Sequence, residues 1–389
     1  LHTTIAGEVL VRLSIFLLCF LATPCAATAE DVPTQPTAQA DGVAVSGYVR
    51  ARYGMVFEGA DGPDFVGIND GFFLDNARLV VTARKGPLDA VVSVDGAVDR
   101  RAAANTAKGQ VDVGLKDAWV GYTIVEALRI QAGQFKPPFD AEELQPTRSM
   151  FFIERAVESR GVQGVEGYNA QGLSLPRQAG ALVGGRMTIA GDFGMEYGLS
   201  VTNGSGANQP VNDNDELAYT GRFELTHDVH FKLGVGVHYN RITNGAVPDL
   251  LNDEEFAYVI DTSYRRQVGA IGFFLAGQYV VVETKSLDVD AEPTSSAMGY
   301  HGAFGLMLPR GFSVGYRYAY LDPTADFDAE DPVVSAVLDV DSVTHHTIGL
   351  GFDAESVPLG IKLNYTLAQE DEGRAVDNDR FDLLMQASF

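Results

Sequence analysis

The chain has 389 residues, two cysteines and a formal net charge of −24. This acidic balance argues against nucleic acid as a partner, because nucleic-acid-binding domains carry a basic patch. Both cysteines, Cys19 and Cys25, lie near the start of the sequence. The rest of the chain can therefore form neither a disulfide framework nor a thiolate metal site. We expect no cofactor and no metal.

A secretory signal peptide is predicted at residues 1–29. Arg12 precedes an apolar run at 13–22, and residues 27–29 read Ala-Thr-Ala, a cleavage site of the A-x-A kind. The run is too short to cross a bilayer as a helix, for which roughly 18 residues are needed. A lipoprotein leader that is acylated at Cys25 is the alternative.

Sixteen β-strands are predicted after a disordered lead-in at residues 30–43. Apolar and polar residues alternate in segments of about ten residues or slightly more, the length of a tilted transmembrane strand. A chain without apolar helices can span a membrane only as a closed barrel. We therefore predict an all-β, transmembrane, antiparallel β-barrel over residues 44–389. The predicted strands lie near 44–57, 71–84, 87–98, 110–122, 126–135, 180–190, 193–203, 215–226, 229–241, 254–266, 268–283, 296–308, 311–322, 341–354, 357–369 and 377–389.

The connections between these strands alternate in length. Tight turns are predicted at Lys85-Gly86, Ala190-Gly191-Asp192, His227-Asp228, Pro309-Arg310 and Glu355-Ser356. Long acidic connections occur between them, and short turns on one rim with long loops on the other are typical of outer-membrane barrels. The acids assigned to the outer loops are Asp249, Asp253, Glu254, Asp288, Asp290, Glu292, Asp322, Asp326, Asp328, Glu330, Asp331, Glu370, Asp371 and Glu372.

The alternation assigns each strand a lipid face and a lumen face. In the first strand Val45, Val49 and Phe57 share one face, and Arg50 and Arg52 share the other. A slip of one residue would turn both arginines to lipid, at about 2–4 kcal/mol each near the bilayer midplane. The cations assigned to the lumen in this way are Arg50, Arg52, Arg78, Arg84, Arg129, Arg186, Arg222, Lys232, Arg265, Arg317 and Lys362.

The last strand has the features of a closing barrel strand. Phe381, Leu383 and Met385 alternate with polar Asp382, and the sequence ends on Phe389. We expect Phe389 to be an assembly signal that the barrel-insertion machinery reads. A soluble, secreted β-sandwich would also alternate, but it does not readily explain sixteen strands with long loops on one side.

The most distinctive sequence motif lies at residues 133–156, GQFKPPFDAEELQPTRSMFFIERA. Here the chain resembles the phosphate-selective porin O and P family, which has a G-Q-F-K-P-P-F run after a barrel strand and a later E-R pair. Residues 116–120 (KDAWV) and 202–206 (TNGSG) are similar to further family segments. The resemblance covers roughly residues 44–389. It implies a sixteen-stranded outer-membrane porin, usually trimeric, that passes anions.

A constriction loop is predicted at residues 136–179, the longest connection in the chain. Lys136 and the two prolines after it cannot continue a strand, because proline lacks a ladder donor. Long structureless loops are usually functional, and this one can fold into the lumen. The alternative is a structural loop whose ions neutralise one another, with Glu154-Arg155 as a local pair. The residues that we assign to the constriction are Lys136, Arg148, Glu154, Arg155 and Arg160.

The function predicted is passive diffusion of small hydrophilic solutes with a preference for anions. Lumen arginines favour anions because charged rings set pore selectivity, whereas acidic loop mouths would attract cations. Phosphate is a candidate solute. The resemblance implies that phosphate selectivity depends on a lysine-rich constriction and on a row of arginines along the lumen. This chain has few lysines, and its arginines do not match such a row residue by residue. The expected partners are the lipid bilayer, lipopolysaccharide, the insertion machinery and two further copies in a homotrimer. The alternative is a non-channel surface barrel, such as an adhesin or an outer-membrane hydrolase.

No enzymatic activity is predicted. Residues 311–315 read G-F-S-V-G, but the G-x-S-x-G motif requires a turn from a strand into a helix. Here the motif lies within a predicted strand, so a chance match is the simpler interpretation.

Overall fold

The structure is a computed structural model that describes residues 41–57, 70–99, 111–163, 166, 170–209, 211–246, 249–287, 294–325, 342–354, 356–370 and 378–389. The predicted signal peptide, residues 1–29, and most of the predicted lead-in lie outside the described residues. Gly42 and Val43, which we had placed in the lead-in, belong to the first strand. No helix in the described ranges is long and apolar enough to cross a membrane.

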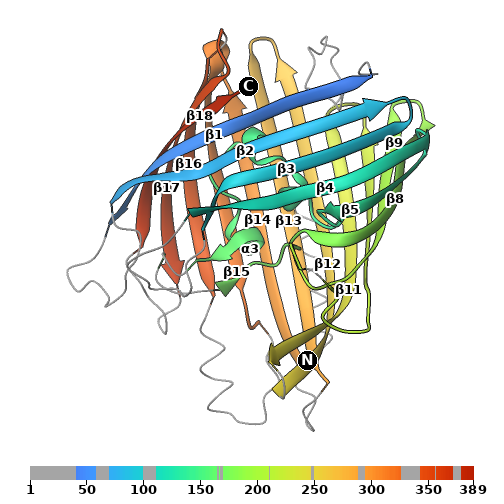
Figure 1. Cartoon of the computed structure of the whole chain (residues 1–389). Helices are drawn as coiled ribbons and strands as arrows, with labels where there is room; N and C mark the ends of the chain where they lie inside the picture. Colours follow the sequence, from blue (N-terminus) through green and yellow to red (C-terminus); the bar gives the residue numbers. More distant parts are fainter. Residues whose placement is uncertain are drawn as a thin grey trace.

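Sixteen strands of the described chain form a closed antiparallel barrel, as predicted, with each strand beside its neighbours in sequence (Figure 1). Their bounds agree with the predicted ranges to within a few residues for all but β11 and β12. The strands are β1 (Gly42–Phe57), β2 (Gly71–Lys85), β3 (Leu88–Asp99), β4 (Val111–Val125), β5 (Leu128–Phe135), β8 (Gln178–Ala190), β9 (Phe193–Thr202), β10 (Ala218–His227), β11 (Phe231–Ala246), β12 (Asp249–Val268), β13 (Ile271–Ser286), β14 (Thr294–Met307), β15 (Phe312–Asp322), β16 (Val343–Asp353), β17 (Leu359–Glu370) and β18 (Asp379–Ser388).

The barrel closes between its first and last strands. β1 and β18 pair from Tyr48 opposite Ser388 to Phe57 opposite Asp379. Beyond the end of β18, Phe389 exchanges two backbone hydrogen bonds with Gly47, each 3.0 Å long. Phe389 therefore continues the ladder that closes the barrel.

The connection between β11 and β12 differs from the prediction. We had placed a loop at residues 242–253, but β11 runs to Ala246 and β12 begins at Asp249. Cross-strand contacts extend the ladder, with Thr243 donating to Asn252 over 2.9 Å. Asp249, Asp253 and Glu254 are therefore strand residues. Figure 1 shows this hairpin reaching beyond the other strands.

Four of the five predicted tight turns lie where they were predicted. Gly86, Gly191 and Asp228 have positive φ angles of 56°, 54° and 54°, the backbone conformation that short hairpin turns require. Pro309 begins the short 3-10 helix η4 (Pro309–Gly311) between β14 and β15. Glu355, in the last predicted turn, lies outside the described residues.

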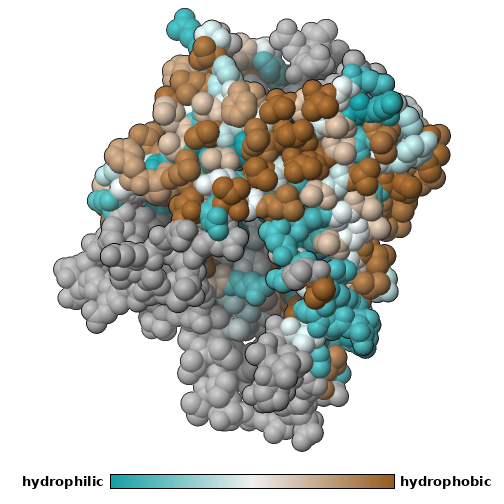
Figure 2. Space-filling model, in the orientation of Figure 1, coloured by the Kyte–Doolittle hydropathy of each residue, from teal (hydrophilic) through white to brown (hydrophobic). Residues whose placement is uncertain are grey.

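The two faces of the strands agree with the prediction. Val45 and Phe57 are 59% and 47% exposed, whereas Arg50 and Arg52 are 2% and 3% exposed. In Figure 2, hydrophobic residues form a broad band across the visible outer face, over β1 to β5, and hydrophilic residues gather below it. An apolar band around a barrel whose interior is polar is the surface that lipid requires.

The described residues between 136 and 177 fold into the barrel. Asp140 caps the helix α2 (Ala141–Leu144) by accepting a 2.7 Å hydrogen bond from the backbone N–H of Glu143. The 3-10 helix η2 (Thr147–Ser149), the helix α3 (Val157–Arg160) and the paired strands β6 (Gly161–Val162) and β7 (Ala170–Gln171) follow. Figure 1 shows α3 inside the ring of strands. We call residues 136–177 the lumen loop.

The lumen loop packs on an apolar patch of the inner wall. Phe139 and Val157 belong to one buried cluster with wall residues such as Val259 of β12, Val280 of β13 and Leu321 of β15. Inner positions of a porin wall are usually polar, so this patch marks where the loop lies. The core of the molecule is thus inside the barrel, on the side of β12–β16.

Candidate functional site

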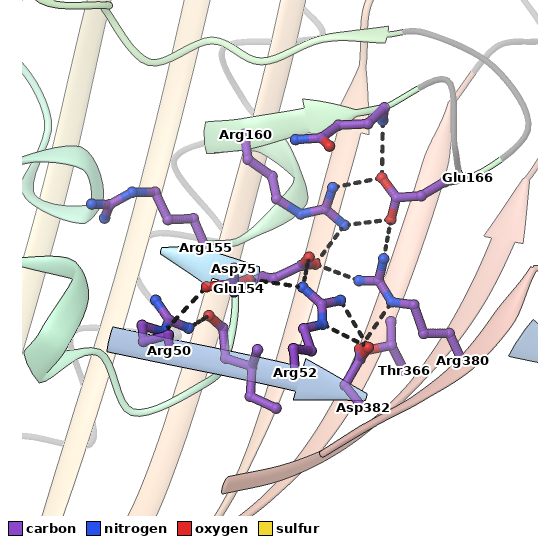
Figure 3. Close-up of polar contacts among 12 residues, drawn as sticks. Arg50, Arg52, Asp75, Glu154, Arg155, Arg160, Glu166, Thr366, Arg380 and Asp382 are labelled. Atoms are coloured by element: carbon purple, nitrogen blue, oxygen red, sulfur yellow. Dashed lines mark hydrogen bonds and ion pairs between the residues drawn. The ribbon is translucent and has the colours of Figure 1, made fainter. Parts of the chain in front are cut away.

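A buried ion network joins the tip of the lumen loop to the strands that close the barrel (Figure 3). Glu154 lies 2.5 Å from Arg52 of β1 and 3.1 Å from Arg160 of α3, and it also pairs with Arg380 of β18. Arg380 pairs in addition with Glu166. The network therefore connects three segments that lie far apart in the sequence.

Two acids of the wall complete the network. Asp382 of β18 lies 2.8 Å from Arg52 and 3.1 Å from Arg380. Asp75 of β2 lies 3.2 Å from Arg50, which also donates to the carbonyl of Ile153 in the loop. Asp75 reaches the lumen because the β1–β2 register shifts at this point, and such a bulge re-aims a side chain.

The network is balanced in charge. Its four guanidiniums and four carboxylates are those of Arg50, Arg52, Arg160, Arg380, Asp75, Glu154, Glu166 and Asp382. Burial alone would raise the pKa of Glu154 and Glu166. The positive charges of Arg160 and Arg380 outweigh this effect, hold the pKa of Glu154 well below its usual range, and lower the pKa of Glu166 to about 2. We infer that these ions hold the loop in place.

Glu154 and Arg155 do not pair with each other. The Arg155 guanidinium lies 2.7 Å from Glu143 and donates to the carbonyl of Gln145 over 2.9 Å. Arg155 thus supports α2, while Glu154 is the centre of the network. This part of the structure resembles the structural-loop alternative, in which the ions neutralise one another.

The wall opposite the docked loop carries a second group of charges. Asp117 of β4 binds Arg177, at the end of the lumen loop, through two hydrogen bonds of 2.8 and 3.1 Å. Lys116 is the extra residue of a β-bulge against β3, where Ser93 pairs with Asp117 and Val94 with Leu115. The bulge lets two adjacent residues approach the lumen.

Cations outnumber acids around Asp117 and Arg177. Arg78 pairs with Asp95 over 2.9 Å, and Lys136 pairs with Glu143 over 2.7 Å. Lys116 makes no ion pair in the part of the chain that the structure describes. Five cations thus accompany three acids: Arg78, Lys116, Lys136, Arg155 and Arg177 with Asp95, Asp117 and Glu143. We call this group the aperture cluster.

Residues of the aperture cluster line two cavities. The larger has a volume of about 1530 Å³ and reaches from the lumen loop to the turn at Glu126. The smaller, about 260 Å³, lies between the loop, β4 and Asn208, and Arg177 lines both. The lining of the larger cavity includes ten Lys or Arg side chains and seven Asp or Glu side chains. The lining of this cavity therefore has a positive excess in a chain whose net charge is −24.

Some of the predicted lumen residues belong to the ion network, and most of the others line the larger cavity. Arg50 and Arg52 belong to the ion network, and Lys362 donates to the carbonyl of Met150. Arg84 is half-buried and is not among the residues that line the larger cavity. The predicted residues that line it are Arg78, Arg129, Arg186, Arg222, Lys232, Arg265, Arg317, Lys136, Arg148 and Glu154.

Most of these cavity cations have acidic partners. Arg222 lies 2.6 Å from Asp261, and Lys232 lies 2.6 Å from Glu224. Arg129 lies 2.7 Å from Asp89, and Arg186 lies 3.6 Å from Glu196. Arg148 and Arg265 are exposed, and neither forms an ion pair within the described ranges.

The prediction missed five residues of these two groups: Asp75, Lys116, Glu166, Arg177 and Arg380. Asp75 and Lys116 lie at bulges, where alternation cannot assign a face. Arg380 follows the alternation of β18, since it shares the inner face with Asp382, and that signal could have found it. Among the described residues, no group of three or more His, Cys, Asp or Glu side chains is arranged to hold a metal ion.

Solved structures with the same fold are outer-membrane proteins. The channel DcaP of Acinetobacter baumannii aligns with a TM-score of 0.58 at 14% identity, over 89% of this chain and 97% of that one. An anion-selective porin from Comamonas acidovorans gives 0.56 at 12%, over 90% and 99%. OmpT of Vibrio cholerae, in a trimer form, gives 0.55 at 10%, over 90% and 100%. At these identities the likeness shows the fold alone.

A family comparison is more specific. No curated protein sequence matches the chain significantly. The model of the family described as phosphate-selective porin O and P matches residues 48–296, which is more than half of the chain. That range includes most of β1, all of β2 to β13, the lumen loop and the aperture cluster. The chain therefore belongs to the phosphate-selective porin O and P family and is a porin channel of the outer membrane.

Proposed function

We propose that this porin passes small hydrophilic solutes by passive diffusion, prefers anions, and selects them at the aperture cluster. The observation that carries the proposal is the cationic excess beside Arg177, which lines both cavities. Charges that line a narrow path determine ion selectivity. Lys116 forms no ion pair within the described residues and adds its charge to this group, although Asp95 and Asp117 act on it electrostatically.

The ion network is not part of the selecting surface in this proposal. Its guanidiniums are matched by carboxylates, and Arg50 and Arg52 are almost completely buried. A passing anion would have to displace an acid from them. This revises the prediction that Arg50 and Arg52 steer anions directly, and it transfers that role to Arg78, Lys116, Lys136 and Arg177.

The acidic outer residues act at a different place. Interactions between exposed charges fade beyond a Debye length, which is about 8 Å at physiological ionic strength. Acids at the outer mouth therefore change the local concentration of ions there, whereas the aperture decides which ions cross. We propose that the net charge of −24 is compatible with anion preference for this reason.

Phosphate is one anion that the aperture could pass. Arginine forks suit oxyanions because they donate two parallel hydrogen bonds. The guanidinium of Arg177 binds the carboxylate of Asp117 in that way, so a passing phosphate would compete with this acid, while Lys116 attracts it without such competition. The proposal requires phosphate to permeate, without requiring it to be the preferred solute.

The proposal includes no catalytic step. Ser313, in the G-x-S-x-G match, is the second residue of β15, and no helix follows it directly. We also propose that the channel works as a homotrimer in contact with lipopolysaccharide, after insertion by the barrel-assembly machinery. The trimer form of the similarly folded Vibrio cholerae OmpT supports this assembly.

Recordings from purified protein in a planar lipid bilayer test the proposal. We expect stepwise increases of current, and we expect the permeability ratio of chloride to potassium to fall when Lys116→Gln removes the unpaired charge. Lys85→Gln, which removes a charge from an exposed turn outside both cavities, is the matched control. A ratio that is unchanged in Lys116→Gln would contradict the role of the aperture cluster.

A further inference from the structure

A row of small residues crosses the inner wall opposite the tip of the lumen loop. Gly305 of β14 pairs with Gly315 of β15, and Gly315 pairs with Gly349 of β16. A Cβ at Gly315 would lie 2.5 Å from a ring carbon of Phe151, and one at Gly349 would lie 3.0 Å from a ring carbon of Phe152. The loop aromatics therefore fill the space that side chains of the wall would otherwise occupy.

These rings form a continuous aromatic row. The ring centroids of Phe274, on β13, and Phe151 are 4.6 Å apart, and those of Phe151 and Phe152 are 5.1 Å apart. A guanidinium lies over each end: Arg265 is 6.0 Å from the centroid of Phe274, and Arg317 is 4.7 Å from that of Phe152. Both separations are within the range of cation–π contacts.

The two ends of the aromatic row differ in their freedom to bind a solute. Arg317 is buried and donates to the carbonyls of Glu154 and Arg155 over 2.9 and 3.2 Å. Arg265 is exposed, lines the larger cavity together with Phe274, and pairs with no acid among the residues that the structure describes. The row thus presents one open guanidinium beside Phe151, which is half-buried, and beside Phe274, of which 7% is exposed.

We propose that Arg265, Phe274 and Phe151 form a binding site for aromatic carboxylates on their way through the lumen. The guanidinium binds the carboxylate as a fork, and the solute ring packs against Phe274 and Phe151 in the tilted arrangements that aromatic pairs prefer. Inorganic phosphate has no apolar face and gains only the first contact. This inference rests on the proposed function, because it names a solute class for the same channel.

Block of the chloride current by benzoate tests the site. Cyclohexanecarboxylate is the comparison solute, since it has the same charge and a similar size without an aromatic ring. We expect benzoate to halve the current at a concentration roughly fivefold lower, the factor that one aromatic contact contributes. Equal half-blocking concentrations for the two acids would overturn the proposal.

Substitutions show which residues bind the blocking acids. Arg265→Gln should weaken block by both acids, whereas Phe274→Leu should abolish the preference for benzoate and leave block by cyclohexanecarboxylate in place. Arg266→Gln and Phe273→Leu are matched controls, because these neighbours pair with each other on the other face of β12 and β13. A loss of preference in the control variants instead would assign benzoate to a different site.

Two further measurements keep the test decisive. The unit conductance in KCl shows whether each variant forms a channel, and Phe151→Leu replaces Phe274→Leu if that variant does not fold. Calorimetric titration of the detergent-solubilised porin with benzoate measures binding without current. An anion-selective channel that shows no preference for benzoate would contradict this inference alone, while a cation-selective channel would contradict the proposed function.

Discussion

Arg52 of the first barrel strand and Glu154 of the lumen loop lie 2.5 Å apart, although 102 positions separate them in the sequence. This ion pair connects the strand that closes the barrel with the segment that narrows it. Arg160 and Arg380 bind the same carboxylate, so the position of the loop depends on one acid more than on any other in the network.

Glu154→Gln should loosen the lumen loop. The substitution leaves three buried guanidiniums without their shared partner, and breaking a buried ion pair costs about 3–5 kcal/mol. We expect larger fluctuations of the open-channel current and faster proteolytic cleavage within residues 136–177. Glu196→Gln breaks a solvent-exposed pair with Arg186 and should cost no more than about 1 kcal/mol. Equal current noise in the two variants would show that the network does not hold the loop.

Gly299→Ala should displace α3 from the wall. A Cβ at Gly299 would lie 2.2 Å from the Cβ of Glu158 and 2.8 Å from the backbone oxygen of Tyr320. Overpacking of this kind costs about 1–3 kcal/mol. Gly302→Ala on the same strand meets nothing within 4 Å and is the control. The thermal unfolding midpoint should fall for Gly299→Ala only; equal midpoints would mean that α3 does not pack on β14 as described.

Alkaline pH should weaken anion preference. Burial lowers the pKa of Lys136 to about 8, although Glu143 opposes the shift. Lys136 is therefore charged below that pH and loses its charge as the pH rises through it, which removes one cation from the aperture cluster. The chloride-to-potassium permeability ratio should fall across this range.

Lys136→Arg isolates this effect, because arginine remains charged throughout. The variant should keep its permeability ratio at alkaline pH, whereas the unmodified channel should not. Identical pH profiles for the two proteins would assign the titration to another group.

Deletion of Phe389 should impair assembly of the barrel. The residue closes the β1–β18 ladder through its two backbone hydrogen bonds with Gly47. We expect less protein in the outer membrane, and an unchanged unit conductance for the channels that do form. Normal amounts of the deletion variant in membrane fractions would show that Phe389 is not an assembly signal.

The barrel could be predicted in detail because lipid imposes a strict alternation on each strand. Arg50 and Arg52 could not face lipid, so the register of β1 followed from the sequence. The β11–β12 hairpin was predicted too short, since its outer part is rich in Asn, Asp and Gly and its apolar residues, such as adjacent Leu250 and Leu251, do not alternate. Pairings such as Thr243 with Asn252 extend it.

The candidate site could be predicted only in part. The loop and its charges were visible, but their partners lie far away in the sequence: Arg380 is 226 positions from Glu154. Lys116 and Asp75 were missed because both lie at bulges, which break the alternation on which the assignment depended. Whether an arginine is free or neutralised follows from these distant pairings, and therefore required the structure.

The sign of the reversal potential of the unmodified channel in a KCl gradient tests the central claim most directly. The cationic excess at Lys116 and Arg177 predicts a potential toward the chloride equilibrium value. A potential toward the potassium equilibrium value would contradict the claim, and would mean that the acidic residues of this chain, rather than its aperture cluster, govern which ions cross.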